Sequence, residues 1–368
     1  MTAELLRATP FHARTAEANR LNRWENRGGF TLAASYADAH AEAVAARFGA
    51  ALADVSWRWR AAVVGARAGE FVSRLFTRDA SQLAPGAAVE ALWLNDAGGV
   101  RGLGTIVRMG QESFLVISEL ADPDWMTKSA ALYGVTVRDV TAEEGVLALV
   151  GPYAGNLLQA AGLDANLEPR ALRKFFWKGL DVTLSRLGSG FELWCPPDDA
   201  LIVWDRLVAA GRAYALRPVG IAAMDLLDLE SGVPRAGRDF TPARDGFSSE
   251  PSPQSLGLAG FVDRGHAFNG RAGHLAAGAE RNLVGILLDS ETPAPQTALM
   301  RDGRAVGRTL GSLNSPAMGR AIALAVVDAD AIAPGTALVA GGTAGHVCAL
   351  PFLPIPVPIP TGDGRSAP

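Results

Sequence analysis

The apolar residues of this chain occur in short runs. The longest of them, such as residues 145–150 and 322–327, are far shorter than the ~20 residues of a membrane-spanning helix. Short apolar runs bounded by turn residues are typical of buried strands. The chain is therefore expected to build its core mainly from many short strands, and no membrane partner is expected.

The first two thirds of the sequence mix such strands with helices. Helix formers or apolar residues at helical spacing predict helices over 36–48, 68–76, 153–161, 199–210 and 219–229. Between them, β-branched and aromatic residues predict strands over 57–64, 88–94, 104–109, 112–117, 135–139, 145–150, 182–186 and 191–195. Hairpins mixed with crossing helices favour an α+β fold over a doubly wound parallel sheet.

The last third has a different pattern. Strands are predicted over 282–289, 297–301, 304–313, 321–327 and 336–341, with turn residues between them. This spacing is typical of a small β-barrel or sandwich. The segment 351–360 carries proline at alternate positions and is expected to be extended.

Composition excludes several classes of protein. The chain has 368 residues, 34 basic and 38 acidic side chains and a net charge of −4 with both signs interspersed, so no nucleic-acid partner is expected. No signal peptide is recognisable, which favours a cytoplasmic location. Its two cysteines, Cys195 and Cys348, have no metal-ligand spacing, and no metal site is predicted.

The segment 185–194 holds one carboxylate, Glu192, on an otherwise apolar strand just after a glycine-rich bend. An unpaired carboxylate in apolar surroundings is costly and normally has a partner. From spacing alone, a solvated strand glutamate is the favoured interpretation of Glu192. The alternative is that Glu192 binds a polar ligand.

The chain resembles the aminomethyltransferase family, which includes the glycine-cleavage T-protein, folate-dependent demethylases and folate-binding relatives. Single pieces of the resemblance are weak, but they follow the family order along nearly the whole chain. These pieces are residues 24–25, 54–56, 94–100, 135–140, 147–154, 185–194, 268–271, 283–285, 306–307 and 315–319.

This resemblance implies a three-domain cloverleaf around a central channel that holds tetrahydrofolate. The first α+β domain is expected at 1–50 with 140–245, because the family splits it around the second, which is expected at 51–139. The β-barrel is expected at 246–350, followed by an extended tail at 351–368. The resemblance leaves a homo-oligomer open.

The same resemblance assigns the candidate site. Glu192 matches the family glutamate that orients the pterin through a charge-assisted bidentate contact, and Trp194 and Tyr36 are predicted to contact the cofactor. Trp57 and His266 are the candidate catalytic residues, although a surface-loop histidine is the commoner case. An aromatic wall is one interpretation of five tryptophans near the channel segments, and core packing is the other: Trp24, Trp57, Trp59, Trp93 and Trp194.

Departures from the family guide the expected activity. Gly102-Leu103 stands where the T-protein has two aspartates, and Met224 and Asp228 stand where it tends to have arginines. Loss of the aspartates removes a charge that can stabilise an iminium-like group. We therefore expect a tetrahydrofolate-dependent demethylase acting on a small methoxyaryl, sulfonium or N-methyl compound. A folate-binding protein without activity is the alternative, and glycine-cleavage aminomethyl transfer ranks third.

Overall fold

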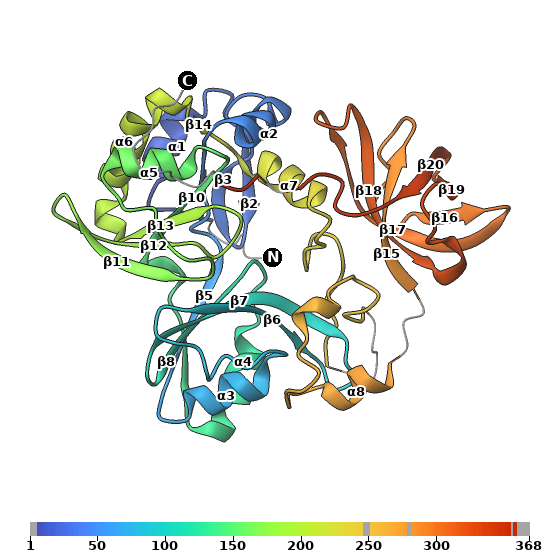
Figure 1. The fold of residues 1–368 in the computed structure, drawn as a ribbon, viewed down its shortest axis with the longest axis horizontal. Coiled ribbons are helices and arrows are strands. Elements are labelled where there is room, and N and C mark those ends of the chain that lie inside the picture. Colours follow the sequence, from blue (N-terminus) through green and yellow to red (C-terminus); the bar gives the residue numbers. More distant parts are fainter. Residues whose placement is uncertain (1–5, 246–250, 278–280, 355, 359–368) are drawn as a thin grey trace.

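The computed structural model describes residues 6–245, 251–277, 281–354 and 356–358. Three lobes surround a common centre, as Figure 1 shows: two mixed lobes of helix and sheet and one all-β lobe. Of the expected tail 351–368, residues 351–354 and 356–358 are neither helix nor strand. The rest of that tail, and residues 246–250 of the expected barrel domain, lie outside the described residues.

The first lobe is built on a six-stranded sheet. Its central strand β10 (Gly145–Val150) is buried at every position. Leu147 and Leu149 face one core and Val146 and Ala148 face the other, because successive side chains of a strand point to opposite faces. In spatial order the sheet is β11 (Leu172–Trp177), β12 (Leu180–Ser185), β13 (Phe191–Cys195), β10, β4 (Ala51–Asp54) and β14 (Arg217–Pro218).

Helices cover both faces of this sheet. Helices α5 (Ala154–Ala161) and α6 (Ala200–Gly211) contribute to the core on one face, and α2 (Ala39–Phe48) and α7 (Ile221–Glu230) to the core on the other. Helix α7 also contacts strands β17 (Arg304–Ser315) and β18 (Arg320–Asp328) of the barrel and so joins two lobes. A small sheet at the N-terminal end contains β1 (Arg7–Ala8), β3 (Phe30–Ala33) and β2 (Trp24–Arg27), with helix α1 (His12–Ala18) nearby.

The second lobe is an antiparallel five-stranded sheet packed against helices α3 (Ala68–Leu75) and α4 (Pro123–Ala130). Phe71 and Val72 of α3 and Met126 of α4 fill its core. The strands, in spatial order, are β6 (Ala88–Leu94), β7 (Val100–Gly110), β8 (Ser113–Ser118), β5 (Trp59–Val64) and β9 (Thr136–Asp139).

The third lobe is a closed six-stranded barrel, which confirms the all-β prediction for this region. Closure leaves no free sheet edge. A segment containing α8 (Arg271–Ala276) precedes the barrel and lies against the second lobe. The barrel strands, in order around it, are β15 (Arg281–Leu288), β18 (Arg320–Asp328), β17 (Arg304–Ser315), β16 (Ala298–Arg301), β19 (Ala337–Ala340) and β20 (Thr343–Cys348).

The α+β fold with a C-terminal barrel is confirmed, whereas several elements were not foreseen. The prediction lacks strands β1, β2, β3, β4, β11, β14 and β20 and helices α1, α4 and α8. β11 is an edge strand that carries Arg173 and Lys174 and exposes Phe176, so it lacks the apolar alternation of a half-buried strand. Six 3-10 turns connect other elements in the described chain: η1 (Ala131–Tyr133), η2 (Thr141–Glu143), η3 (Pro197–Asp199), η4 (Arg212–Tyr214), η5 (Ala259–Phe261) and η6 (Ala329–Ala331).

The domain boundaries stay a proposal. Strand β4 at residues 51–54 pairs with β10 in the first sheet, although those residues fall in the proposed second domain. The first barrel strand begins at Arg281, within the proposed third domain. None of the described helices is long and apolar enough to cross a membrane.

Candidate functional site

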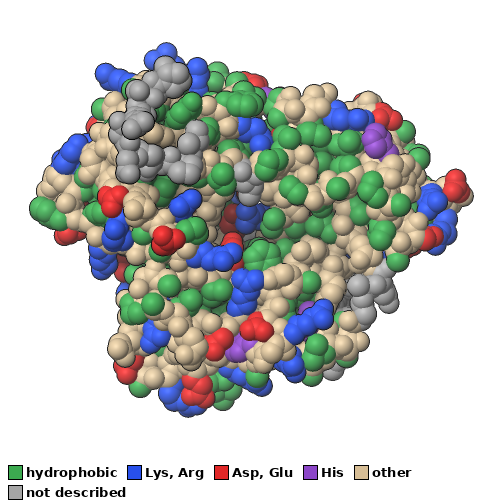
Figure 2. All heavy atoms as spheres, viewed as in Figure 1, with side chains coloured by type: hydrophobic (Ala, Val, Ile, Leu, Met, Phe, Trp, Pro, Cys, Tyr) green, Lys and Arg blue, Asp and Glu red, His purple; other side chains and the backbone are tan. Residues whose placement is uncertain are grey.

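The three lobes enclose a central cavity of about 750 Å³. Figure 2 shows it as a hollow near the middle of the molecule, with basic and acidic side chains in it. Ala148 and Glu192 contribute from the first sheet, Leu103 and Ile117 from the second, and Pro351 from the segment after the barrel. A cavity of this size, lined by apolar side chains together with charged ones, can hold a small molecule with both apolar and polar parts.

Glu192 lies on the wall of this cavity, a position from which a carboxylate can reach a ligand. On strand β13 it is opposite Ala148 of β10 and Ser185 of β12. Its Oε1 accepts a hydrogen bond from Arg58 Nη1 at 2.8 Å, and its Oε2 lies 3.5 Å from Ser185 Oγ. Its side chain is 13% exposed. The partner expected for a carboxylate in apolar surroundings is therefore Arg58, which sequence reasoning did not identify.

Trp194 lies on the same face of β13 as Glu192 and is linked to it through Ser185. Its indole Nε1 donates to Ser185 Oγ at 3.2 Å, and Ser185 in turn lies beside Glu192. The ring is buried in the core between the first sheet and helix α7. Trp194 therefore reaches the site through Ser185 and is not among the residues that line the cavity.

The other tryptophans do not form a common wall. Trp59 and Trp93 are buried in the core of the second lobe, and Trp24 donates to Asn22 Oδ1 at 2.6 Å near the N-terminal sheet. Among the five, only Trp57 lines either of the two cavities found within the described parts of the chain. Core packing, the simpler interpretation, therefore explains Trp59 and Trp93.

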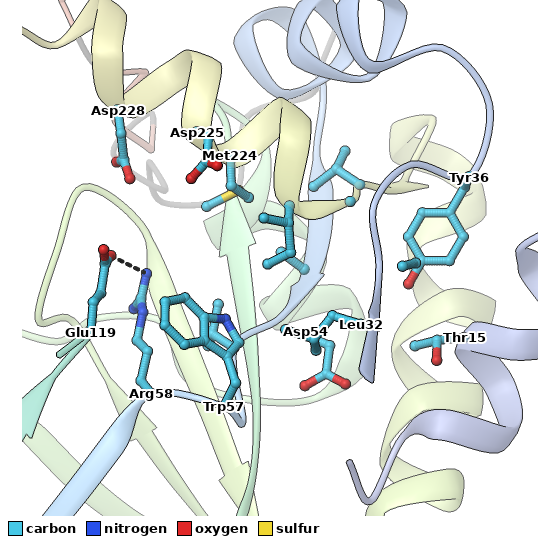
Figure 3. Close-up of a pocket in the computed structure, with 16 residues that line it drawn as sticks. Thr15, Leu32, Tyr36, Asp54, Trp57, Arg58, Glu119, Met224, Asp225 and Asp228 are labelled. Atoms are coloured by element: carbon cyan, nitrogen blue, oxygen red, sulfur yellow. Dashed lines mark ion pairs between the residues drawn. The ribbon is translucent and has the colours of Figure 1, made fainter. Parts of the chain in front are cut away.

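Trp57 and Tyr36 line a smaller pocket of about 20 Å³ beside the central cavity (Figure 3). The guanidinium of Arg27 lies 5.5 Å from the Trp57 ring, and Trp57 Nε1 is buried without a hydrogen-bond partner among the described residues. Burial, together with the charges of Asp54 and Glu42, raises the pKa of the Tyr36 phenol. The pocket has room for about one water molecule, so both residues lie beside the large cavity and not on its wall.

Asp54 is the buried carboxyl of this smaller pocket. Its Oδ2 accepts from Thr9 Oγ1 at 2.5 Å, and its Oδ1 accepts from the Ser56 backbone N–H at 3.0 Å and Oγ at 2.7 Å. Burial raises the pKa of Asp54 despite these donors. Its hydrogen bonds tie the end of β4 to the N-terminal segment, so Asp54 holds the framework beneath Trp57.

His266 lies away from both cavities. Its Nε2 is 2.6 Å from the Ser73 carbonyl oxygen on helix α3, and its ring packs beside Phe268. It is not among the described residues that line either cavity. The role of His266 as an acid stays a prediction that its position does not support.

Charged side chains ring the part of the cavity near α7. Figure 3 shows Asp225 and Asp228 reaching from α7 toward Arg58 and Glu119. Asp228 pairs with Arg235 at 3.0 Å. Burial by itself would raise the pKa of Asp228, but the nearby charge of Arg235 outweighs burial and holds that pKa below its usual range. The arginines expected at 224 and 228 are missing, but Arg235 lines the cavity beside Asp228.

The missing aspartate pair has a structural explanation. A Cβ built on Gly102 would overlap the indole of Trp93, its partner on strand β6. Leu103, the next residue, lines the cavity with an apolar side chain. Strand β7 therefore carries no carboxylate at these positions. The carboxylates that do line the cavity are Glu90, Glu119, Glu192 and Asp228.

The residues present fit tetrahydrofolate, the cofactor that the resemblance implies. Glu192 offers a carboxylate to the amide and amino groups of a pterin, and Leu103 and Ile117 give apolar surface for flat rings. Arg170 and Arg186 line the cavity as well and suit the anionic tail of a folate. No group of three His, Cys, Asp or Glu within the described residues could hold a metal ion.

Two protein families match this chain. The GCVT N-terminal domain matches residues 11–263, and the glycine cleavage T-protein C-terminal barrel domain matches residues 281–353. A crystal structure of the glycine cleavage system aminomethyltransferase T from Bartonella henselae superposes with a TM-score of 0.83 at 24% identity. The match covers 95% of this chain and 98% of that one, which confirms the fold expected from the resemblance.

Curated relatives with the name aminomethyltransferase share about a third of the sequence. The Frankia alni protein is 33% identical, covering 82% of this chain and 85% of its own length. The Thermus thermophilus protein is 31% identical, with 89% and 94% covered, and the Halalkalibacterium halodurans protein is 30% identical, with 85% and 88% covered.

These names correct the expected activity. The preference for a demethylase of methoxyaryl, sulfonium or N-methyl compounds is contradicted, since broad similarity to aminomethyltransferases favours the reading that ranked last. The prediction gave the local loss at Gly102-Leu103 more weight than similarity along the whole chain. The expected family and its use of tetrahydrofolate are both confirmed. The chain belongs to the aminomethyltransferase family of glycine cleavage T-proteins.

Proposed function

We propose that this protein transfers a one-carbon unit from an aminomethyl donor to tetrahydrofolate. The observation that carries the proposal is Glu192, a carboxylate on the wall of a cavity of about 750 Å³ between the three lobes. The name of the curated relatives supports the aminomethyl donor. Chemically, the aminomethyl carbon loses its bonds to the rest of the donor and to the amine and gains bonds to two nitrogens of tetrahydrofolate. The rest of the donor keeps its electron pair and takes up one of the two displaced protons, and the amine takes up the other and leaves as ammonia.

In this proposal the chain's own residues orient the cofactor. Glu192 would accept hydrogen bonds from the pterin, and Ser185 and Trp194 would hold the Glu192 side chain in place. Such a bidentate contact fixes the ring plane and brings the reacting nitrogens into a defined position. Arg170 and Arg186 would attract the folate tail.

Negative charge near the transferring carbon comes from other carboxylates in this proposal. An aminomethyl group develops iminium-like positive charge as its bond to the donor breaks, and a nearby carboxylate stabilises it. Glu90 and Asp228 line the cavity although strand β7 lacks the aspartate pair. Asp228 lies on helix α7, whereas Glu90 lies on strand β6.

The test is the affinity for tetrahydrofolate, measured by calorimetric titration. Glu192→Ala is expected to weaken binding about 100-fold, because charge-assisted hydrogen bonds contribute about 1.5–3 kcal/mol. Glu70→Ala removes an exposed glutamate of helix α3 and is the matched control, with unchanged affinity. Equal affinities for wild type and Glu192→Ala would contradict the assignment of Glu192.

Turnover is tested separately. Wild-type protein mixed with tetrahydrofolate and an aminomethyl donor is expected to form methylenetetrahydrofolate and ammonia, detected by chromatography and an ammonia assay. Glu192→Ala should lower this rate at subsaturating tetrahydrofolate. Tight folate binding without any product would contradict the transfer activity.

A further inference from the structure

Arg58 is a charged residue of the cavity that neither the sequence motifs nor the proposed function explains. It lies between strands β4 and β5, where the chain crosses from the first sheet to the second, and it lines both the central cavity and the small pocket. Its side chain is 23% exposed. Arg58 Nε is buried and donates no hydrogen bond to any described residue.

The guanidinium of Arg58 lies between two carboxylates from different lobes. Its Nη1 donates to Glu192 Oε1 at 2.8 Å. Its Nη2 is 3.9 Å from Glu119 Oε1, just after strand β8, and Figure 3 marks this ion pair. The first contact is a hydrogen bond and the second is only within ion-pair reach. Moving from one carboxylate to the other keeps the charge paired, so the desolvation penalty of an isolated charge does not arise.

The guanidinium and a pterin edge present the same pattern to a carboxylate. Guanidinium carries N–H donors in one plane, arranged to match carboxylate geometry. The amide N–H and amino group of a pterin are likewise neighbouring coplanar donors. Because Glu192 Oε1 already accepts from Arg58, a pterin that takes both oxygens must displace this arginine.

We propose that Arg58 is a positioning residue that competes with the pterin for Glu192 and moves to Glu119 when the pterin binds. This inference rests on the proposed function, since it assumes tetrahydrofolate at Glu192. It assigns Glu119 a specific task, which is to hold the displaced guanidinium. Arg58 thereby sets the affinity of the site for the cofactor and links the first two lobes in both arrangements.

The competition between Arg58 and the pterin predicts a measurable change in the affinity for tetrahydrofolate. Apparent affinity falls by the fraction of molecules in which the binding-competent arrangement is present. If Arg58 holds Glu192 in about nine tenths of molecules, its removal raises the affinity for tetrahydrofolate about tenfold. Glu119→Gln weakens the alternative position of the guanidinium, and affinity is then expected to fall about threefold.

The experiment is a double-mutant cycle read by calorimetric titration with tetrahydrofolate. Arg58→Met should bind about tenfold more tightly than wild type, and Arg58→Lys, which lacks the planar fork, should show a smaller gain. Glu119→Gln should weaken binding in the wild-type background and have no effect when combined with Arg58→Met. Arg67→Met, on the exposed surface of the second lobe, loses the same charge and should leave affinity unchanged.

The outcomes separate the two proposals. Weaker or unchanged binding by Arg58→Met, with its melting temperature close to that of wild type, overturns the competition. An equal effect of Glu119→Gln in both backgrounds overturns the role of Glu119. If tetrahydrofolate binds neither wild type nor Arg58→Met, the proposed function itself fails and this inference fails with it.

Discussion

Two strands on opposite sides of the central cavity differ in the side chains that they place on its wall. Strand β13 carries Glu192 on its cavity side, with Arg58 and Ser185 in contact with the carboxylate. Strand β7 has Gly102 and Leu103 where the family resemblance expects aspartates. Strand β13 therefore places a charged side chain at the cavity, whereas β7 has a glycine and an apolar side chain at the corresponding positions.

The difference between the strands follows from what lies next to each position. Beside Glu192, on the same face of the sheet, Ser185 and Trp194 form the hydrogen-bonded support that a buried carboxylate needs. At Gly102 the indole of Trp93 fills the space that a side chain would occupy. A carboxylate there would have neither room nor a partner. Ligand orientation is therefore expected from the β13 side.

The largest effect that tests this comparison is expected from Gly102→Asp. Its side chain would collide with Trp93 and bury a charge, so the free energy of unfolding should fall by about 3 kcal/mol. Leu103→Asp, one residue further along the strand, places the same group on the cavity wall and should cost only about 1 kcal/mol. Urea denaturation followed by circular dichroism measures both values.

The two substitutions control each other, since they introduce the same carboxylate into one strand. Equal destabilisation would contradict the assignment of Gly102 to the packed side and Leu103 to the cavity side. A stable Gly102→Asp protein would mean that Trp93 can move aside, and the contrast between β7 and β13 would then be one of sequence only.

A medium effect, dependent on pH, is expected from Asp54→Asn in the sheet that contains β13. Because burial raises the pKa of Asp54, its folded state keeps the proton to higher pH than the unfolded chain does. The stability from this proton is fully present below the unfolded pKa of about 3.9 and is lost as pH rises through the folded pKa. Asparagine does not titrate, so the advantage of wild type over Asp54→Asn should shrink by about 1 kcal/mol as pH rises.

Scanning calorimetry between about pH 4 and pH 8 measures this gap. Thr9→Val removes a donor that lowers the pKa of Asp54, so the pH-dependent loss should extend to higher pH in that variant. A gap that widens with rising pH would show that Asp54 is more acidic in the folded state, opposite to the effect of its burial.

The smallest expected effect is the slow chemical modification of Cys195, the last residue of β13, whose thiol is buried in the core of the first lobe. Burial raises the pKa of Cys195 to about 12, and that of Cys348 in the barrel to about 11. At pH 8 only roughly 10⁻⁴ and 10⁻³ of these thiols are ionised, so iodoacetamide should modify both slowly and Cys195 more slowly. Mass spectrometry of the folded and the urea-unfolded protein measures the rates. Rapid modification of folded Cys195 would indicate that β13 opens readily.

Local patterns predicted much of the fold because they depend on near neighbours along the chain. Strands β6, β10 and β13 have the bounds expected from their apolar runs. The edge strand β11 was missed, because an edge position tolerates charged side chains and weakens the alternation. The expected acid His266 contacts the backbone of α3, a contact between residues 193 positions apart that no local pattern encodes.

For the candidate site, too, some features could be predicted from the sequence and others could not. The sequence by itself determined the family and the α+β regions followed by a barrel, since these rest on motifs and periodicity. Glu192 as the residue that would hold a pterin stays a prediction from the family resemblance. Only the tertiary structure decided that Arg58, 134 positions away, pairs with Glu192 and that Trp93 fills the space at Gly102. Both facts depend on side chains brought together by sheet pairing and lobe packing, which a pattern along one chain does not specify.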